Sequence, residues 1–244
     1  WLKIDLTSKK STGETAGILA KHHMNTICTS GLCPNRSECW MARTATLMIG
    51  GDICTRKCRF CNTLSGRPSL LNPDEPRRVA ESVKALKLRY AVITSVDRDD
   101  LPDYGAAHWI KTIEEIRRLN PDTKIELLIP DFMGKADLIR QVMATHPHVA
   151  GHNMETVRRL TPSVRSVARY ERSLEVLREI ANCGITAKTG FMLGLGETHD
   201  EILETMDDIL STGCQRLTLG QYLQPTAEHL PVKAYITPEM FAEY

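Results

Sequence analysis

Three cysteines stand within eight residues in the stretch Cys54-Thr-Arg-Lys-Cys58-Arg-Phe-Cys61. This C-x3-C-x2-C spacing allows three thiols to hold one small inorganic core. On a four-iron cluster, three thiolates leave one iron without a protein ligand. Because an open coordination position is where a small molecule can bind, the stretch predicts a cluster that takes part in chemistry.

A second triplet lies fifteen residues upstream, with Cys28, Cys33 and Cys39 in a C-x4-C-x5-C spacing. Six of the eight cysteines therefore lie in a window of 34 residues. Gly31 and the run Cys33-Pro34-Asn35 interrupt this triplet, so its thiols are predicted to lie on turns rather than on a helix face.

Three interpretations of the thiols compete. Disulfides need an oxidising compartment, no targeting segment indicates one, and the other two cysteines, Cys183 and Cys214, stand alone. Zinc usually takes four ligands in paired knuckles or with histidine. Two groups of three thiols fit iron–sulfur clusters better. A non-catalytic electron carrier stays an alternative, although a carrier normally completes each cluster with a fourth thiolate.

Composition and charge argue against nucleic-acid binding and against association with a membrane. The chain has 244 residues, 42% of them hydrophobic, which suits one large domain. Lysine plus arginine (31) nearly balance aspartate plus glutamate (30), so no global field draws the protein to nucleic acid or an anionic membrane. No run approaches the roughly 18 apolar residues of a spanning helix, and no signal segment opens the chain. We expect a cytoplasmic protein that binds neither membrane nor nucleic acid.

From residue 42 onward, short apolar runs alternate with segments of helical spacing. Six strand-then-helix units in series predict a parallel sheet with right-handed crossovers, and hence an α/β fold. The sheet is either open and doubly wound or a partial TIM-type (β/α)6 barrel, and we favour the barrel. The predicted strands cover residues 45–49, 90–94, 124–129, 148–152, 185–193 and 217–221.

Polar residues recur just after successive predicted strands, which is the reason for favouring the barrel. The carboxyl ends of barrel strands meet at one mouth, where the active sites of such folds lie. The residues concerned are Cys54, Ser95 with Asp97, Asp131, Asn153 with Glu155, Glu197 and Gln221.

The loop motif with Phe60 as its aromatic residue, placed after the first strand of a six-unit barrel, resembles the radical S-adenosylmethionine (SAM) enzymes. More narrowly, the chain from about Cys28 to Val232 is similar to the lipoyl synthase family. The similarity rests on Cys33-Pro34-Asn35, Glu38-Cys39-Trp40, Thr44-Ala-Thr, Gly51-Asp-Ile-Cys54-Thr-Arg, Val92 to Pro102, His152-Asn-Met-Glu-Thr156, Gly194-Leu-Gly-Glu-Thr198 and Gly220-Gln-Tyr-Leu-Gln-Pro225.

The resemblance implies two 4Fe–4S clusters and a reaction. Cys54, Cys58 and Cys61 would hold the cluster whose free iron chelates SAM. A reducing electron then cleaves SAM, and the resulting radical removes hydrogen from an unactivated C–H bond, which no side-chain acid or base can ionise. The implied target is an octanoyl chain on a carrier-protein lysine, at C6 and C8. Cys28, Cys33 and Cys39 would hold an auxiliary cluster that donates two sulfur atoms.

The resemblance also implies contacts with SAM and partners. Expected contacts are Phe60, Ser95, Asp97, Asn153, Glu155, Gln221 and Leu223, with loop capping or barrel-mouth packing as the structural alternative for each polar position. The implied partners are an octanoylated lipoyl carrier domain or H protein, an electron donor such as ferredoxin or flavodoxin, and an iron–sulfur carrier that rebuilds the auxiliary cluster.

Other charged groups receive structural interpretations. Arg98-Asp99-Asp100 reads as a solvated turn, although an arginine near the mouth can hold a carboxylate. Arg165, Arg169 and Arg172 read as a helix surface or as a basic rim for an acidic carrier. His146, His148 and His152 read as structural histidines, because no fourth metal ligand accompanies them.

We expect three regions: residues 1–42 as an extension with the auxiliary ligands, 43–236 as the barrel, and 237–244 as the start of a truncated C-terminal segment. Residues 1–27 lack a sustained period and read as an arm, and Trp1 does not read as a native start. In the resembling family a serine of a C-terminal Arg-Ser-Ser-Tyr motif completes the auxiliary cluster, and this sequence contains no such motif. A biotin-synthase-like enzyme stays the enzymatic alternative.

Overall fold

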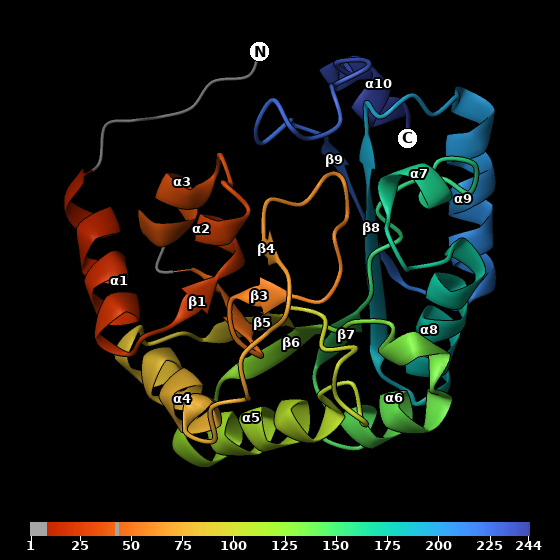
Figure 1. The fold of residues 1–244 in the computed structure, drawn as a ribbon. Coiled ribbons are helices and arrows are strands. Elements are labelled where there is room, and N and C mark those ends of the chain that lie inside the picture. The colour runs from red at the N-terminus through yellow and green to blue at the C-terminus, as the bar shows by residue number, and fades with distance from the viewer. Residues whose placement is uncertain (1–8, 42–43) are drawn as a thin grey trace.

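The computed structural model describes residues 9–41 and 44–244, and its centre is a curved seven-stranded sheet (Figure 1). The strands lie in the order β1-β2-β5-β6-β7-β8-β9. Neighbouring strands from β2 to β9 are parallel, and β1 pairs antiparallel with β2. Their bounds are β1 Asn25–Thr26, β2 Thr46–Ile49, β5 Tyr90–Ser95, β6 Lys124–Leu128, β7 Val149–Gly151, β8 Thr186–Leu193 and β9 Arg216–Gln221.

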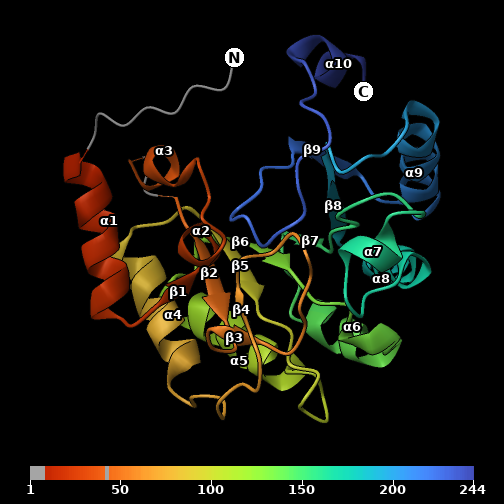
Figure 2. The ribbon, with the colours of Figure 1, turned by 45° about the horizontal axis from the view of Figure 1, so that its top comes forward.

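Helices cover the outer face of the curved sheet, and the inner face is directed toward the site (Figures 1 and 2). In the described residues β1 and β9 are the two edges and do not pair with each other, so the barrel is open. The prediction of an α/β partial barrel is therefore confirmed. The outer helices are α4 Glu75–Ala85, α5 Ala106–Leu119, α6 Ala136–Met143, α8 Tyr170–Asn182 and α9 His199–Ser211; shorter ones are η1 Phe132–Gly134, α7 Thr161–Val164 and α10 Pro238–Glu243.

The main core lies between the sheet and these helices. On β5, Ala91 and Ile93 are fully buried and belong to one cluster with Val79 and Val83 of α4 and Ile113 of α5. Successive strand residues point to opposite faces, so the residues between them, such as Val92, line the inside of the barrel. Burial of each large aliphatic side chain contributes roughly 1.5–3 kcal/mol, which fixes the strand register around the site.

Side-chain caps fix where two of the helices begin. The Thr198 side chain accepts a hydrogen bond from the Glu201 amide, and the Glu201 side chain accepts one from the Thr198 amide, so the two residues form a capping box at the start of α9. Thr237 caps α10 by accepting from the Met240 amide. At α4, however, Asp74 is the N-cap without a side-chain bond, and the Asn72 side chain instead accepts from the Asp74 amide.

The prediction of an irregular N-terminal arm is wrong for the described residues. Lys9–Lys21 form helix α1, which packs on α3 and α4. Thr15 donates a hydrogen bond to the Trp40 carbonyl at 3.0 Å, and β1 joins the edge of the sheet. The expected boundary at residues 42 and 43 and the chain start at Trp1 lie outside the described residues.

The prediction that the first cysteine triplet lies on turns is correct for one thiol only. Cys28 lies in the four-residue helix α2 (Ile27–Ser30), and Cys39 lies in α3 (Arg36–Met41). Cys33 lies in the connection between the two helices. The interruptions at Gly31 and Pro34 end one short helix and precede another, rather than excluding helix altogether.

Among the described residues, no helix is both long enough and apolar enough to cross a membrane.

Candidate active site

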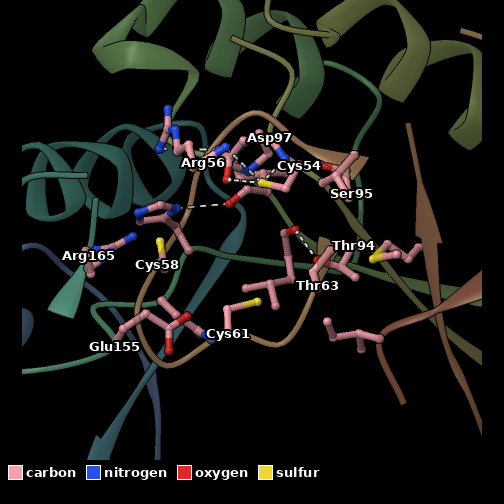
Figure 3. Close-up of a pocket in the computed structure, with 18 of the residues that line it drawn as sticks. Cys54, Arg56, Cys58, Cys61, Thr63, Thr94, Ser95, Asp97, Glu155 and Arg165 are labelled. Atoms are coloured by element: carbon pink, nitrogen blue, oxygen red, sulfur yellow. Dashed lines mark hydrogen bonds and ion pairs between the residues drawn. The ribbon is translucent and has the colours of Figure 1, made fainter. Parts of the chain in front are cut away.

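The three thiols of residues 54–61 line one cavity of about 250 Å³ at the carboxyl ends of the central strands (Figure 3). Cys54, Cys58 and Cys61 are half-buried and free. In the view of Figure 3 the thiols of Cys58 and Cys61 lie between Arg165 and Glu155 on one side and the β5 strand end on the other. Three thiols that face one space are the arrangement that a shared inorganic core requires.

The backbone before and after the thiol loop holds it in place. Gly50 and Gly51 have φ values of 84° and 98°, in the left-handed region that favours glycine. The buried Glu75 carboxylate accepts from the Gly50 amide at 2.8 Å and is itself bonded to His108. Strands β3 (Ile53–Cys54) and β4 (Leu64–Ser65) then pair and close the base of the loop. The loop therefore leaves the sheet in a fixed direction.

Arg56 ties the middle of the thiol loop to the barrel. Its side chain is only 3% exposed, and its guanidinium makes a two-pronged ion pair with Asp99 at 2.7 and 2.8 Å. It also contacts Asp131 at 2.6 Å, at the end of β6, and Asp97 at 3.3 Å, after β5. Burial alone would raise the pKa of Asp131, but the Arg56 guanidinium holds it well below its usual range. Such charge-assisted bonds position the thiols on either side of Arg56.

Cys54 lies in a polar environment suited to a metal-bound thiolate. The backbone amides of Arg56 and Asp97 donate to its Sγ at 3.4 and 3.3 Å, and its thiol donates to Asp97 Oδ2 at 3.7 Å. Burial, with the nearby Asp97 carboxylate, raises the pKa of the Cys54 thiol to about 12. Burial also raises the pKa of Asp97 to about 6. The thiol is thus protonated in the protein alone, and a bound cation supplies the charge that favours the thiolate.

Cys58 faces the opposite, basic side of the cavity. Burial raises the pKa of the Cys58 thiol, and Ser166 at 3.8 Å and Arg165 act against that increase. The buried Arg165 donates to Ser173 Oγ at 2.8 Å, while its Nε has no hydrogen-bond partner among the described residues. Burial raises the pKa of the Glu155 carboxyl, with Arg165 opposing. A buried cation with an unused donor therefore lines the cavity beside the thiols.

Five of the seven residues expected to contact SAM line this cavity: Phe60, Ser95, Asp97, Asn153 and Glu155. Glu155 has a φ of 66°, which is unusual for a residue other than glycine. Its backbone is held there by bonds to Gly190 and Met192 of β8. Such local strain is common where a side chain must be directed at a ligand.

The other two expected contacts, Gln221 and Leu223, are not in the lining of this cavity. Gln221 Nε2 donates to the carbonyls of Leu193 and Ala234 at 3.3 and 3.1 Å, and its Oε1 accepts from the Ile236 amide at 2.8 Å. The side chain thus holds the segment after β9 against the end of β8, as the packing alternative describes.

Two residues of the cavity carry more than their sequence context indicated. Arg56, between two cysteines, had no assigned role, and Arg165 read as a surface or rim residue. Asp99 read as part of a solvated turn, but it binds Arg56, and its neighbour Arg98 is buried and donates to the Gly50 carbonyl at 3.1 Å. For Arg56 the available signal was its position between two cysteines, and for Arg98 and Asp99 it was their position just after a strand; Arg165, at the end of α7, carries no such signal.

His152 forms part of the cavity wall as a neutral, fully bonded side chain. Its Nδ1–H donates to the Ile129 carbonyl at 2.9 Å, and its Nε2 accepts from Ser173 Oγ at 3.0 Å. Burial lowers the pKa of His152 from 6.5 to about 4, and Arg165 acts in the same direction. The structural interpretation of this histidine is consistent with these contacts.

The depressed pKa of His152 predicts a loss of stability in mild acid. The unfolded chain takes up a proton below pH 6.5, whereas the folded protein does so only near pH 4, so stability is full above 6.5 and falls as the pH drops toward 4. The expected contribution is roughly 2 kcal/mol between pH 7.5 and 5. Urea unfolding of the parent and of His152→Gln at both pH values measures it. Equal pH slopes in the two proteins would contradict the prediction.

The second thiol triplet lies next to the first. Burial raises the pKa of the Cys39 thiol, and the proximity of Cys28 and Cys33 adds to this increase, so the three thiols are near one another. Asn62, which follows Cys61, donates to the Ser30 carbonyl in α2 at 2.8 Å. Ile27, next to Cys28, lines the cavity of the first triplet. The two triplets are thus connected across the barrel mouth.

The donor sets fit iron–sulfur clusters. All eight cysteines are free, which excludes the disulfide interpretation for this structure. The described residues contain no three His, Cys, Asp or Glu side chains placed to hold a single metal ion. A four-iron core is larger than one ion and takes a separate thiolate at each of several irons, together with N–H···S bonds like those to Cys54. Thiolate donors are the kind that such clusters select.

Comparison with known proteins gives a family. Residues 48–209 match the family model of the radical SAM superfamily. The chain is 61% identical over its full 244 residues to the lipoyl synthase of Bacteroides fragilis strain YCH46, of which it covers 85%. It is 62% identical over 242 residues to that of Porphyromonas gingivalis strain W83, covering 99% of this chain and 86% of that protein. Identity to the lipoyl synthase of Treponema denticola is 52% over 244 residues, the whole of this chain and 84% of that protein.

Solved structures share the fold. A maturase of the FeFe-hydrogenase superposes with a TM-score of 0.63 at 14% identity, over 96% of this chain and 60% of that one. A methylornithine synthase superposes with a TM-score of 0.60 at 12% identity, over 77% of this chain and 56% of that one. These likenesses show the fold alone. The matched family model and the full-length relatives together show that the chain belongs to the lipoyl synthase family of radical SAM sulfurtransferases.

Proposed function

We propose that this protein inserts two sulfur atoms at C6 and C8 of an octanoyl chain carried on a protein lysine. The observation that carries the proposal is the convergence of Cys54, Cys58 and Cys61 on one cavity that also contains an incompletely bonded arginine. When bound there, a 4Fe–4S cluster with SAM supplies the one-electron chemistry that activates an unreactive C–H bond. The protein supplies three thiolates, a fixed loop and a partly enclosed cavity.

Arg165 is suited to bind the carboxylate of SAM. Its guanidinium is buried, its Nε is unpaired within the described chain, and two of its other bonds go to neutral groups, Ser173 Oγ and the Met154 carbonyl. A planar guanidinium binds a carboxylate through two parallel hydrogen bonds. Asn153 and Glu155 add an amide and a carboxyl that can bond the remaining polar groups of the cofactor.

Arg165→Gln is expected to raise the KM for SAM at least about tenfold, because a charge-assisted bond is lost, with a smaller change in kcat. Arg169→Gln is the matched control, since Arg169 is exposed at the N-cap of α8 and does not line the cavity. Steady-state formation of 5′-deoxyadenosine measures both constants. An unchanged KM in Arg165→Gln, or an equal rise in the control, contradicts the assignment.

Cys28, Cys33 and Cys39 are assigned to an auxiliary cluster that supplies the sulfur. Their thiols are near one another, and Ile27 beside them lines the cavity of the first triplet, so this cluster lies close to the substrate.

The corresponding regions are residues 1–42 for the extension, 43–236 for the barrel and 237–244 for the C-terminal segment. The substrate is an octanoylated lipoyl domain or H protein, the reductant is a ferredoxin or flavodoxin, and an iron–sulfur carrier rebuilds the auxiliary cluster.

The test uses anaerobically reconstituted protein with dithionite, SAM and an octanoyl-lysyl peptide. Two full clusters give about eight irons per chain. The expected products are 5′-deoxyadenosine and a peptide that has gained sulfur, detected by mass spectrometry. No 5′-deoxyadenosine would instead indicate an electron carrier. 5′-Deoxyadenosine without sulfur addition to this peptide, but with sulfur addition to another unactivated carbon substrate, would indicate a biotin-synthase-like enzyme.

A further inference from the structure

The residues on either side of Cys58 in the chain, Lys57 and Arg59, are exposed cations. Within the described part of the chain neither forms an ion pair; Arg59 Nη1 donates to the Ser163 carbonyl at 3.3 Å, and the Lys57 ammonium has no contact there. The exposed Arg158, before α7, is by contrast paired with carboxylates of α8 and α9. The thiol loop therefore presents two uncompensated positive charges to solvent beside an expected cluster ligand.

The Cys58 thiol lies close to the surface at this point. Its Sγ is 3.8 Å from the Ser166 Oγ, and Ser166 is exposed. The Ser166 Oγ also accepts a hydrogen bond from the Lys57 amide at 3.1 Å, and the Arg59 amide donates to the Val164 carbonyl at 2.9 Å. A single exposed side chain thus lies between the Cys58 sulfur and the surface.

A groove of about 620 Å³ opens on the same segment, and Ser166 lines it; we call it the α7–α8 groove. Its apolar lining residues include Pro162, Val167 and Ala168. The Val167 side chain is exposed, and Lys57, whose amide bonds Ser166, stands at the edge of the groove. Arg165 lines both this groove and the thiol cavity. An apolar centre beside exposed charges is the composition of a protein interface, and electron-transfer partners use small interfaces.

The α7–α8 groove lies away from the auxiliary thiols. In both views of the ribbon α7 is on the opposite side of the thiol loop from α2 and α3 (Figures 1 and 2). The proposed reaction needs the acyl chain between the two triplets, on the side of Ile27. On the groove side, the bonds of the Lys57 and Arg59 amides close the loop against the end of α7. An acyl chain needs an open passage, whereas an electron crosses packed side chains.

We propose that Lys57, Arg59 and the α7–α8 groove form the docking surface for a small acidic protein that delivers the electron for SAM cleavage. The inference rests on the proposed function, which requires one electron for each SAM cleaved. That electron leaves the partner's reduced flavin or iron–sulfur group, which is oxidised, and enters the cluster at Cys58, which is reduced; no atom crosses the interface. The partner is acidic because uncompensated cations attract and orient a protein of opposite charge.

The test follows the oxidation of a purified acidic flavodoxin, reduced photochemically to its hydroquinone, by the reconstituted protein with SAM in a stopped-flow instrument. Lys57→Gln combined with Arg59→Gln should lower the second-order rate constant roughly tenfold at low salt, because the attraction is lost. High salt should slow the parent by a similar factor and change the variant little. With dithionite as reductant, the variant should keep its iron content and form 5′-deoxyadenosine within about twofold of the parent, since neither side chain lines the thiol cavity.

Lys111→Gln combined with Arg178→Gln is the matched control, because it removes two charges of the same kinds from exposed positions on α5 and α8. An equal loss in this control would overturn the inference. A parent rate that does not fall with salt would also overturn it, and that measurement needs no substitution. A normal rate with the flavodoxin but a raised KM for an octanoylated carrier protein would show that the surface binds the substrate carrier instead. Salt-sensitive electron delivery without any sulfur addition would retain the inference and contradict the proposed reaction.

Discussion

Cys58→Ala is expected to reduce 5′-deoxyadenosine formation by roughly a thousandfold or more, because it leaves only two thiolates for a cluster that already has one iron without a protein ligand. The cavity offers no replacement. His152 is the only histidine in its lining among the described residues, and both of its ring nitrogens are already bonded. The neighbouring Ser166 hydroxyl, 3.8 Å from the Cys58 sulfur, is a poor ligand for iron compared with a thiolate.

The measurement combines product formation with iron content. Cys58→Ala should lose up to about four irons per chain and the SAM-dependent change in the electron paramagnetic resonance spectrum. Cys183→Ala is the matched control, because Cys183 is the C-cap of α8 and does not line the thiol cavity. It should keep the parent's iron content and activity. A Cys58→Ala protein that still cleaves SAM at a tenth of the parent rate would remove Cys58 from the ligand set.

The strands could be predicted because their sequence carries a strong local signal. On β5 and β8, apolar residues form short runs bounded by turns, and this pattern is typical of parallel strands that are covered on both faces. Helix α1 carries a weak signal. It contains Gly13 and Gly17, which lower helix propensity, and few of its described side chains are buried. Packing on α3 and α4, which sequence alone does not show, stabilises it.

The ligands of the site could be predicted, but their supports could not. Cysteine spacing is local information, so the three thiols of the loop could be grouped from sequence. The partners of Arg56 lie 43 and 75 positions away, at Asp99 and Asp131, and depend on the curvature of the sheet. In the sequence Arg165 reads as a surface residue. In the structure α7 and the segment after it fold back over the thiol loop, where the Arg59 amide donates to the Val164 carbonyl, and this places Arg165 in the cavity.

Gln221 illustrates the opposite case. Its position at the end of the last strand indicates that it lines the thiol cavity, yet its side chain bonds the segment that returns after β9. At Gly194, with a φ of 103°, a Cβ would lie 2.5 Å from the Gln221 amide and 2.4 Å from the Ala234 carbonyl oxygen. The close approach of the two segments therefore depends on a glycine, and the space that Gln221 occupies is defined by residues 13 positions later in the chain.

Cys33→Ala is expected to separate the two halves of the reaction. Cys33 lies between α2 and α3, packs at the edge of the main core and is not in the lining of the thiol cavity. Cleavage of SAM should therefore stay within about threefold of the parent. Sulfur incorporation into the octanoyl-lysyl peptide should fall at least about a hundredfold, because two thiols hold the auxiliary cluster poorly.

Mass spectrometry of the peptide and quantification of 5′-deoxyadenosine in one reaction give the ratio that decides this. A fall in iron of up to four per chain, with the spectrum of the SAM-binding cluster retained, is the accompanying signature. The Cys183→Ala protein again provides the comparison for a lost thiol outside both triplets. Sulfur insertion that continues in Cys33→Ala would mean that the sulfur comes from elsewhere. Loss of both activities would contradict the separate roles of the two triplets, because it would mean that the upstream triplet supports the loop of Cys54, Cys58 and Cys61. The hydrogen bond from Asn62 to the Ser30 carbonyl is too weak to make that loop depend on the upstream triplet.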